Sequence, residues 1–314
     1  MERSLRGSLT SLPSGVRVPS DVRLPSSRLR GEPRPSPLVS EHASPLDHAI
    51  RAAFAAGREI LDVYARPINV ELKEDHSPLT EADKRAHEAI VRELGPTGLP
   101  VLSEEGRSIG PEQRQHWSRY WLVDPLDGTK EFVKRNGEFT VNIALMERDG
   151  EPLSSLGSAR PLAGVLYVPV MDRLYFAWPG QGAYRLEQAA TFGSSSAYEL
   201  IPRAQRLPMP TARTAFTIVA SRSHASPDTD AFIQRMRDQH GDVALTSMGS
   251  ALKICLVAEG AADAYPRYAP TMEWDTAAGH AIANEAGKAL IDVTTNAPLR
   301  YNKHDLVNPW FIVQ

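Results

Sequence analysis

The segment WLVDPLDGTKEF, residues 121–132, carries the most specific local pattern of the sequence. An apolar run ends in Asp124 and a proline, and a second carboxylate, Asp127, stands directly before Gly128. Two carboxylates and a backbone carbonyl on one turn offer the hard oxygen ligands that magnesium prefers. If the N–H groups of Gly128 and Thr129 open a helix, they would also bind phosphate oxygens. The spacing equally allows an Asx-type turn in which Asp127 caps a helix.

Further acidic residues lie where predicted strands end and helices begin. Glu104 and Glu105 close a short apolar strand, and Asp275 stands at the start of an alanine-rich helix. Chain ends of this kind can point into a shared cleft, although Asp275 alone reads as a helix N-cap. Thr80 and Asp83 fit a capping box, and a catalytic role for the same pair is compatible with it.

The sequence from residue 45 onward alternates helical and strand patterns. Apolar residues recur at three- and four-residue steps from His48 to Tyr64, and a second periodic stretch closes at Gly95. We expect strands around residues 101–102, 120–125, 139–145, 164–170, 173–178, 216–221 and 262–266, and later helices at 228–239, 250–259 and 276–286. The pattern predicts a layered α/β protein.

Three regions are predicted along the chain. Residues 1–44 are rich in Arg, Ser and Pro without any apolar period, which favours a disordered extension. An organellar transit peptide is the alternative, but its prolines would interrupt the required amphipathic helix. Residues 45–200 are expected to form a lobe with the metal site, and residues 201–314 a second lobe with the specificity residues. The polar, proline-rich stretch 186–212 marks the seam between them.

Composition and charge exclude several classes of protein. A net charge of -3 gives no electrostatic footprint for a nucleic acid polymer. The single cysteine, Cys255, excludes an internal disulfide framework and lies in an apolar run, where an inert core role is expected. No apolar run approaches the roughly 20 residues that span a bilayer. The predicted location is the cytoplasm, with peripheral association at the inner membrane as an alternative.

Several motifs in register resemble a known family. WLVDPLDGTKEF and EWDTAAGHAI resemble the two signature motifs of the inositol monophosphatase family. EDHSPLTEAD, VLSEEG, RNGEFTVNIAL, SRSH and GSALKICLVAEGAADAYPR resemble its branch of 3'(2'),5'-bisphosphate nucleotidases, and Lys130-Glu131 favours that branch. The resemblance covers the chain from about residue 45 to its end. It implies a five-layered α/β/α/β/α sandwich of the inositol monophosphatase and fructose-1,6-bisphosphatase type, with the active site between the lobes.

The resemblance also implies a site with two or three magnesium ions. Glu104, Asp124 and the carbonyl of Leu126 would bind the first ion. Asp124, Asp127 and Asp275 would bind the second, so that Asp124 bridges the two.

Catalytic and substrate-binding roles follow from the same resemblance. Asp83 and Thr129 would hydrogen-bond to each other and help deprotonate the attacking water, with Glu104 near that water. The implied substrate contacts are Glu104, Leu126, Asp127, Gly128, Thr129, His224, Ser250, Lys253, Arg267 and Asp275. A lysine and an arginine suit the second phosphate of a bisphosphate nucleotide, which inositol monophosphate lacks. Without the resemblance, Lys253 reads equally as a solvent-facing helix lysine and His224 as a turn residue.

The expected activity is magnesium-dependent hydrolysis of the 3'-phosphate of adenosine 3',5'-bisphosphate, a by-product of sulfate assimilation. An inositol monophosphatase or broad sugar-phosphate phosphatase would share the metal site, and a non-catalytic nucleotide or cation sensor is the alternative from another class. The expected partner is a small-molecule nucleotide bisphosphate, bound by a monomer or homodimer. The resemblance further suggests inhibition by lithium.

Overall fold

The computed structural model describes residues 44–67, 70–72, 78–150, 156–193, 195–220 and 226–314. These residues all belong to one compact unit, His42–Gln314. The predicted extension, residues 1–44, lies outside the described residues except for Ser44.

The first helix, α1 (Pro45–Tyr64), begins at a capping box. The Ser44 hydroxyl accepts a hydrogen bond from the N–H of Asp47, and the Asp47 carboxylate accepts one from the N–H of Ser44. This reciprocal cap, with proline in the first turn, starts the helix before the predicted His48.

The second helix, α2 (Glu81–Leu94), packs beside α1 and ends directly before Gly95, as predicted. A hairpin of β1 (Val70–Leu72) and β2 (Pro78–Thr80) leads into it. Thr80 is the N-cap, and Asp83 reaches back to it, so the predicted capping box is confirmed.

A mixed sheet lies next to these two helices. In the described part of the chain its strands, in spatial order, are β3 (Val101–Ser103), β4 (Arg119–Asp127), β5 (Thr140–Arg148), β6 (Ala159–Val168), β7 (Arg173–Trp178), β8 (Gly182–Glu187) and β9 (Gln205–Leu207). β3 runs parallel to β4, and the other neighbours are antiparallel. The seam predicted at 186–212 therefore includes the edge strand of this sheet, and the lobe boundary stays a prediction.

The opposite face of the sheet is covered by α8 (Glu273–Glu285), with α7 (Leu252–Ala258) beside it. The helix α8 begins earlier than the predicted residue 276 because Met272 takes the N-cap position. Asp275 therefore lies inside the first turn, where its carboxylate accepts a hydrogen bond from the Met272 N–H at 2.9 Å. The interpretation of Asp275 as the N-cap itself is wrong.

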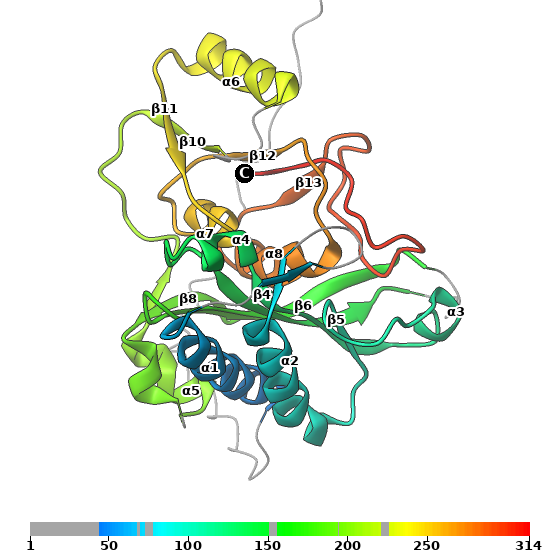
Figure 1. The fold of residues 1–314 in the computed structure, drawn as a ribbon. Helices are drawn as coiled ribbons and strands as arrows, with labels where there is room; N and C mark the ends of the chain where they lie inside the picture. The colour runs from blue at the N-terminus through cyan, green and yellow to red at the C-terminus, as the bar shows by residue number, and fades with distance from the viewer. Residues whose placement is uncertain (1–43, 68–69, 73–77, 151–155, 194, 221–225) are drawn as a thin grey trace, which may run out of the picture. The chain divides into compact units, whose positions relative to one another are not determined.

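Two smaller sheets and one helix complete the fold. β10 (Phe216–Ala220) pairs in parallel with β11 (Val243–Ser247), and β12 (Tyr265–Arg267), β14 (Phe311–Val313) and β13 (Leu290–Asp292) form the second small sheet in that order. The helix α6 (Pro227–His240) packs on β10, β11 and β12. Figure 1 shows the resulting succession of helix, sheet, helix, sheet and helix layers. The predicted five-layered α/β/α/β/α sandwich is confirmed.

Short helices fill the connections. They are α3 (Pro111–Arg114), α4 (Thr129–Val133), α5 (Ala197–Leu200), η1 (Gly95–Thr97), η2 (Ala189–Phe192) and η3 (Ile201–Arg203). Among the helices of the described residues, none is both long and apolar enough to cross a membrane.

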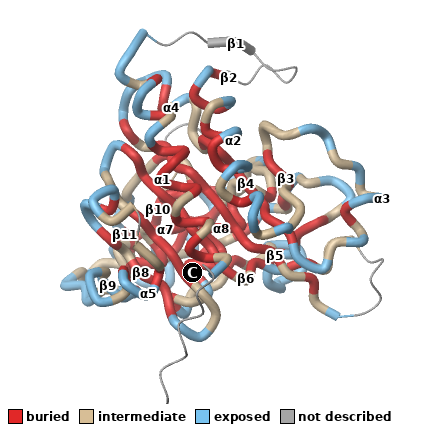
Figure 2. Tube along the Cα trace, turned by 90° about the horizontal axis from the view of Figure 1, so that it is seen from below, coloured by how far each residue is buried: buried red, intermediate tan, exposed pale blue. Residues whose placement is uncertain are grey.

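The strand β4 is buried on both faces, which places its C-terminal end in the interior. Trp121 and Val123 belong to the apolar cluster under α1 and α2, whereas Tyr120 and Leu122 belong to the cluster under α7 and α8. This alternation is the period of two that a strand requires, and Figure 2 shows the buried positions concentrated in these central elements. By the same alternation, Asp124 leaves the sheet on the α8 side.

Candidate active site

The site is built where β4 becomes irregular. Asp124 pairs with Asn142 of β5 and Asp127 with Thr140, so a step of three residues on β4 faces a step of two on β5. Such a β-bulge bends the strand and redirects its side chains. Asp124 Oδ1 accepts a hydrogen bond from the Leu126 N–H at 3.0 Å, which closes the turn. Gly128 then adopts φ +93°, a conformation that glycine reaches without strain.

Three carboxylates from separate elements converge at this bulge. Oxygen atoms of Glu104, Asp124 and Asp275 lie within 4.8 Å of one another. Glu104 follows β3, and its N–H donates to the carbonyl of Val123 at 3.1 Å, which fixes it beside β4. Asp275 reaches the cluster from the first turn of α8. The structure thus brings together residues that are up to 171 positions apart in the sequence (275 − 104).

The electrostatics of this cluster suit a divalent cation. Burial raises the pKa of Asp124 well above its usual range, and the neighbouring Glu104 and Asp127 raise it further. Burial also raises the pKa of Asp275, with Asp127 adding to the effect. Carboxylates that repel one another in a buried site are stabilised as anions when a metal ion lies between them. The donor set consists of oxygen atoms, which fits magnesium.

Asp127 is held by three hydrogen bonds to one oxygen, Oδ2. The donors are the Ala251 N–H at 2.6 Å, Asn142 Nδ2 at 3.3 Å and the Thr140 hydroxyl at 3.5 Å. Gly128, and not Asp127, occupies the N-cap position of α4. The alternative role of Asp127 as a helix cap is therefore wrong, because the bulge turns its side chain towards β5 and α7.

Asp83 links the capping box of α2 to the start of α4. Its Oδ2 accepts hydrogen bonds from the N–H and hydroxyl of Thr80 at 2.8 and 2.7 Å. Its Oδ1 lies 3.3 Å from the Thr129 hydroxyl, which is also 3.4 Å from the carbonyl of Leu126. The Asp83 side chain therefore serves the helix cap with one oxygen and contacts Thr129 with the other.

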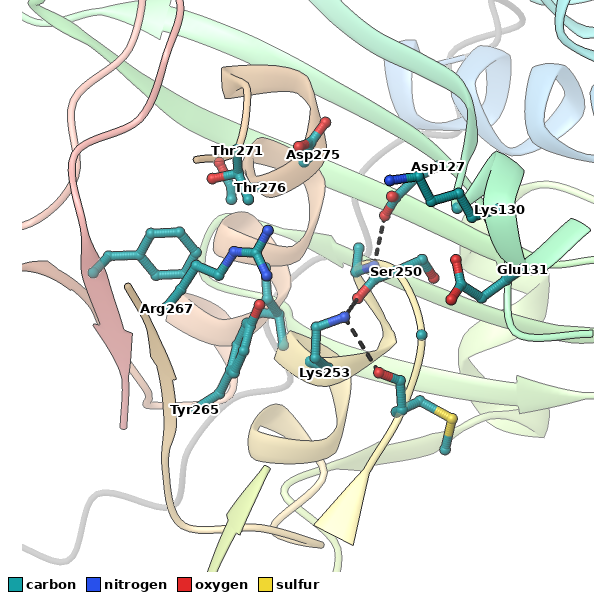
Figure 3. A pocket seen from close by; sticks show the side chains of 16 residues that line it. Asp127, Lys130, Glu131, Ser250, Lys253, Tyr265, Arg267, Thr271, Asp275 and Thr276 are labelled. Carbon is teal, nitrogen blue, oxygen red and sulfur yellow. Dashed lines mark hydrogen bonds between the residues drawn. The ribbon is translucent and has the colours of Figure 1, made fainter. Parts of the chain in front are cut away.

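Two adjoining cavities contain most of the predicted site residues. The first, of about 320 Å³, is lined by Glu104, Asp124, Leu126, Asp127, Gly128, Thr129, Lys130, Glu131, Pro270 and Asp275. The second, of about 140 Å³, adds Ser250, Lys253 and Arg267, and it shares with the first Asp127, Gly128, Lys130, Glu131 and Asp275. In Figure 3, Lys253 and Arg267 approach this second cavity from α7 and β12, and Asp127 approaches it from the opposite side.

The cations of the second cavity are only partly paired by the protein. Lys253 is 7% exposed, and its Nζ donates to the carbonyls of Ser250 and Met248 at 2.7 and 3.3 Å. Burial lowers the pKa of Lys253 to about 8, although Asp127 opposes the shift. Within the described residues, Nε of Arg267 and Oγ of Ser250 are buried without a hydrogen-bond partner. The interpretation of Lys253 as a solvent-facing lysine is wrong, because α7 turns it into the interior.

Two residues named in the sequence analysis, His224 and Cys255, remain to be placed. His224 lies outside the described residues. Cys255 is fully buried, which confirms the expected core position. Two residues of this site, Thr140 and Asn142, were not predicted, and both are buried. Their signal in the sequence is the pair of polar residues at alternate positions of an otherwise apolar strand.

Comparisons with known proteins identify relatives of this chain. The profile of the inositol monophosphatase family matches residues 42–310. The 3'(2'),5'-bisphosphate nucleotidase CysQ of Escherichia coli K12 is 44% identical over 274 residues, which cover 85% of this chain and 98% of that protein. The crystal structure of CysQ from Bacteroides thetaiotaomicron superposes with a TM-score of 0.76 at 51% identity, covering 85% of this chain and 95% of the other. A Thermotoga maritima inositol monophosphatase shares the fold, with a TM-score of 0.62 at 24% identity, over 86% of this chain and 91% of the other.

Proposed function

The chain belongs to the inositol monophosphatase family, and we propose that it removes the 3'-phosphate of adenosine 3',5'-bisphosphate to give AMP and phosphate. It is a metal-dependent phosphoric monoester hydrolase of the 3'(2'),5'-bisphosphate nucleotidase type. The relatives of that name are matched over nearly their whole length. The observation that carries the choice of substrate is the pair of cations beside the carboxylate cluster, the buried Lys253 and the half-buried Arg267. The reaction would clear a by-product of sulfate assimilation.

The carboxylates define where magnesium would be held. Glu104, Asp124 and the carbonyl of Leu126 are assigned to one ion, and Asp124, Asp127 and Asp275 to a second. All of these residues line the first cavity, and their oxygen atoms are the ligands that magnesium prefers. When bound, magnesium supplies positive charge that offsets the charge of the phosphate and lowers the pKa of a coordinated water.

Thr129 and Asp83 are assigned to the attacking water. The Thr129 hydroxyl can donate its hydrogen to Asp83 Oδ1, at 3.3 Å, which leaves its oxygen lone pairs to accept a hydrogen bond from water. Asp83 is buried and fixed by Thr80, so it holds the Thr129 hydroxyl in one orientation. Glu104 lines the same cavity and is the second acceptor near that water.

The second cavity would hold the other phosphate of the substrate. Within the described residues, the hydrogen bonds of Lys253 all go to backbone carbonyls. No ion pair there neutralises its charge. Arg267 and the Ser250 hydroxyl contribute further donors to the same cavity. A phosphate dianion would complete these groups, because charge-assisted hydrogen bonds to buried cations are among the strongest available. Inositol monophosphate has no second phosphate to place there.

A panel of phosphate-release assays tests this proposal. Purified protein with magnesium is given adenosine 3',5'-bisphosphate, adenosine 3'-monophosphate and inositol 1-phosphate, with a chelator control. The proposal predicts the highest kcat/KM for the bisphosphate and no release in the chelator. Faster release from inositol 1-phosphate would identify an inositol monophosphatase instead. Absence of release from all three substrates would favour the sensor alternative.

A further inference from the structure

The turn between β11 and α7, residues 248–251, is held by hydrogen bonds to two carboxylates from an earlier part of the chain. The Gly249 N–H donates to Glu138 Oε2 at 2.7 Å, and the Ala251 N–H donates to Asp127 Oδ2 at 2.6 Å. Both carboxylates precede the turn by more than 100 residues. The position of the turn is therefore set by the part of the chain that carries the metal cluster.

The backbone of this turn is strained. Ser250 adopts φ +45°, a left-handed conformation that is unfavourable for a residue with a side chain. A Cβ on Gly249 would lie 2.6 Å from the Glu138 carbonyl oxygen, so the two chain segments touch closely. Such a conformation persists only when its surroundings fix it. The bond from Gly249 to Glu138 is one of the contacts that fix it.

The 248–251 turn also holds Lys253, the buried cation of the substrate cavity. The carbonyls of Met248 and Ser250, on either side of Gly249, accept hydrogen bonds from Lys253 Nζ at 3.3 and 2.7 Å. The buried Ser250 hydroxyl lines the same cavity. A shift of the turn would therefore move both the Lys253 ammonium and the Ser250 hydroxyl away from a bound anion.

We propose that Glu138 is a positioning residue for substrate selection: its carboxylate holds the 248–251 turn so that Lys253 and Ser250 meet the second phosphate of the substrate. The inference rests on the proposed function. In the described part of the chain, the residues that line the two cavities do not include Glu138. Loss of the Glu138 carboxylate leaves the bond from Ala251 to Asp127 in place, so recognition of the second phosphate should suffer while hydrolysis itself is spared.

Three variants separate this role from a general structural one. Glu138→Ala removes the acceptor, and Glu138→Asp keeps the charge but is one methylene too short to reach Gly249. Glu138→Gln retains a carbonyl oxygen at the same reach and serves as the conservative rescue. For each variant, kcat and KM are measured with adenosine 3',5'-bisphosphate and with adenosine 3'-monophosphate, together with the melting temperature.

The proposal predicts a split between substrates. Because the displaced turn takes both Lys253 and Ser250 away from the second phosphate, Glu138→Ala and Glu138→Asp should raise KM for the bisphosphate about tenfold, roughly the loss of one charge-assisted contact. KM for the monophosphate and both kcat values should stay within about threefold, and Glu138→Gln should remain near wild type. Equal losses on both substrates, or unchanged KM values in Glu138→Asp, would overturn the role of Glu138. A wild-type enzyme without preference for the bisphosphate would instead overturn the proposed function.

Discussion

Replacing Lys253 with methionine removes the buried cation of the second cavity and preserves most of its side-chain volume. A hydrogen bond to a charged group contributes about 1.5–3 kcal/mol, which corresponds to roughly 10- to 150-fold in binding. KM for adenosine 3',5'-bisphosphate should rise by that factor. KM for adenosine 3'-monophosphate, which has no second phosphate, should change by less than about threefold, and kcat should be retained for both.

The variant should also remain folded. Burial lowers the pKa of Lys253 from 10.5 to about 8, so keeping the charge in the folded state at neutral pH costs about 3 kcal/mol. Methionine relieves that cost and loses two hydrogen bonds to carbonyl oxygens, each contributing about 1 kcal/mol. The free energy of unfolding should therefore change by no more than about 2 kcal/mol.

Initial-rate assays over a range of substrate concentrations give both KM values, and urea unfolding checks the fold. Lys134→Met is the matched control, because Lys134 is exposed and lines neither cavity. An unchanged KM for the bisphosphate in Lys253→Met would refute the reasoning. The same loss of affinity for both substrates would refute it as well.

Three other changes test separate parts of the account. Asp124→Asn should abolish phosphate release and keep the melting temperature, since it removes charge from the centre of the cluster; activity within tenfold of wild type would contradict that role. Thr140→Val should raise the magnesium concentration for half-maximal activity about tenfold, because it removes a hydroxyl that contacts Asn142 and Asp127. Thr140→Ser keeps the hydroxyl and should leave that concentration unchanged. Identical magnesium titrations of Thr140→Val and the wild type would exclude the effect. Burial lowers the pKa of His280 to about 3, so the unfolded chain binds a proton below pH 6.5 that the folded chain excludes, and stability should fall by about 1.4 kcal/mol per pH unit as pH drops from 6.5 towards 3. Urea unfolding at pH 6.5 and 5 should show a shallower loss in His280→Gln, and equal slopes would show that His280 is not responsible.

The fold was predictable where local patterns and capping residues agree. The helix α2 begins at Thr80 and ends before Gly95 as predicted, because both ends are determined by side-chain and backbone features within a few residues. The start of α8 was placed too late, because the predicted pattern began at Thr276 and the helix begins at Glu273, after the non-polar cap Met272. The strand β9, within the stretch 186–212, was not predicted for a related reason. The short strand β9 is polar in sequence, and only its pairing with β8 identifies it as part of the sheet.

The sequence indicated which residues form the candidate site, but not the contacts between segments that hold them in place. The spacing of Asp124 and Asp127 indicated a ligand turn, but the β-bulge against Asn142 and Thr140 depends on the register with β5, which the sequence does not state. The contact of Asp127 with the Ala251 N–H joins residues 124 positions apart and has no local signature. Roles assigned to the site residues through family resemblance stay predictions until they are tested by substitution.

A crystal structure with adenosine 3',5'-bisphosphate and calcium, a divalent ion that also binds oxygen ligands, tests the central claim most directly. The account predicts metal density among Glu104, Asp124 and Asp275, with the 3'-phosphate beside it. The 5'-phosphate should lie within hydrogen-bond distance of Lys253 Nζ and the Arg267 guanidinium. A 5'-phosphate bound away from both cations, with the 3'-phosphate still at the metal cluster, would contradict the account of substrate choice.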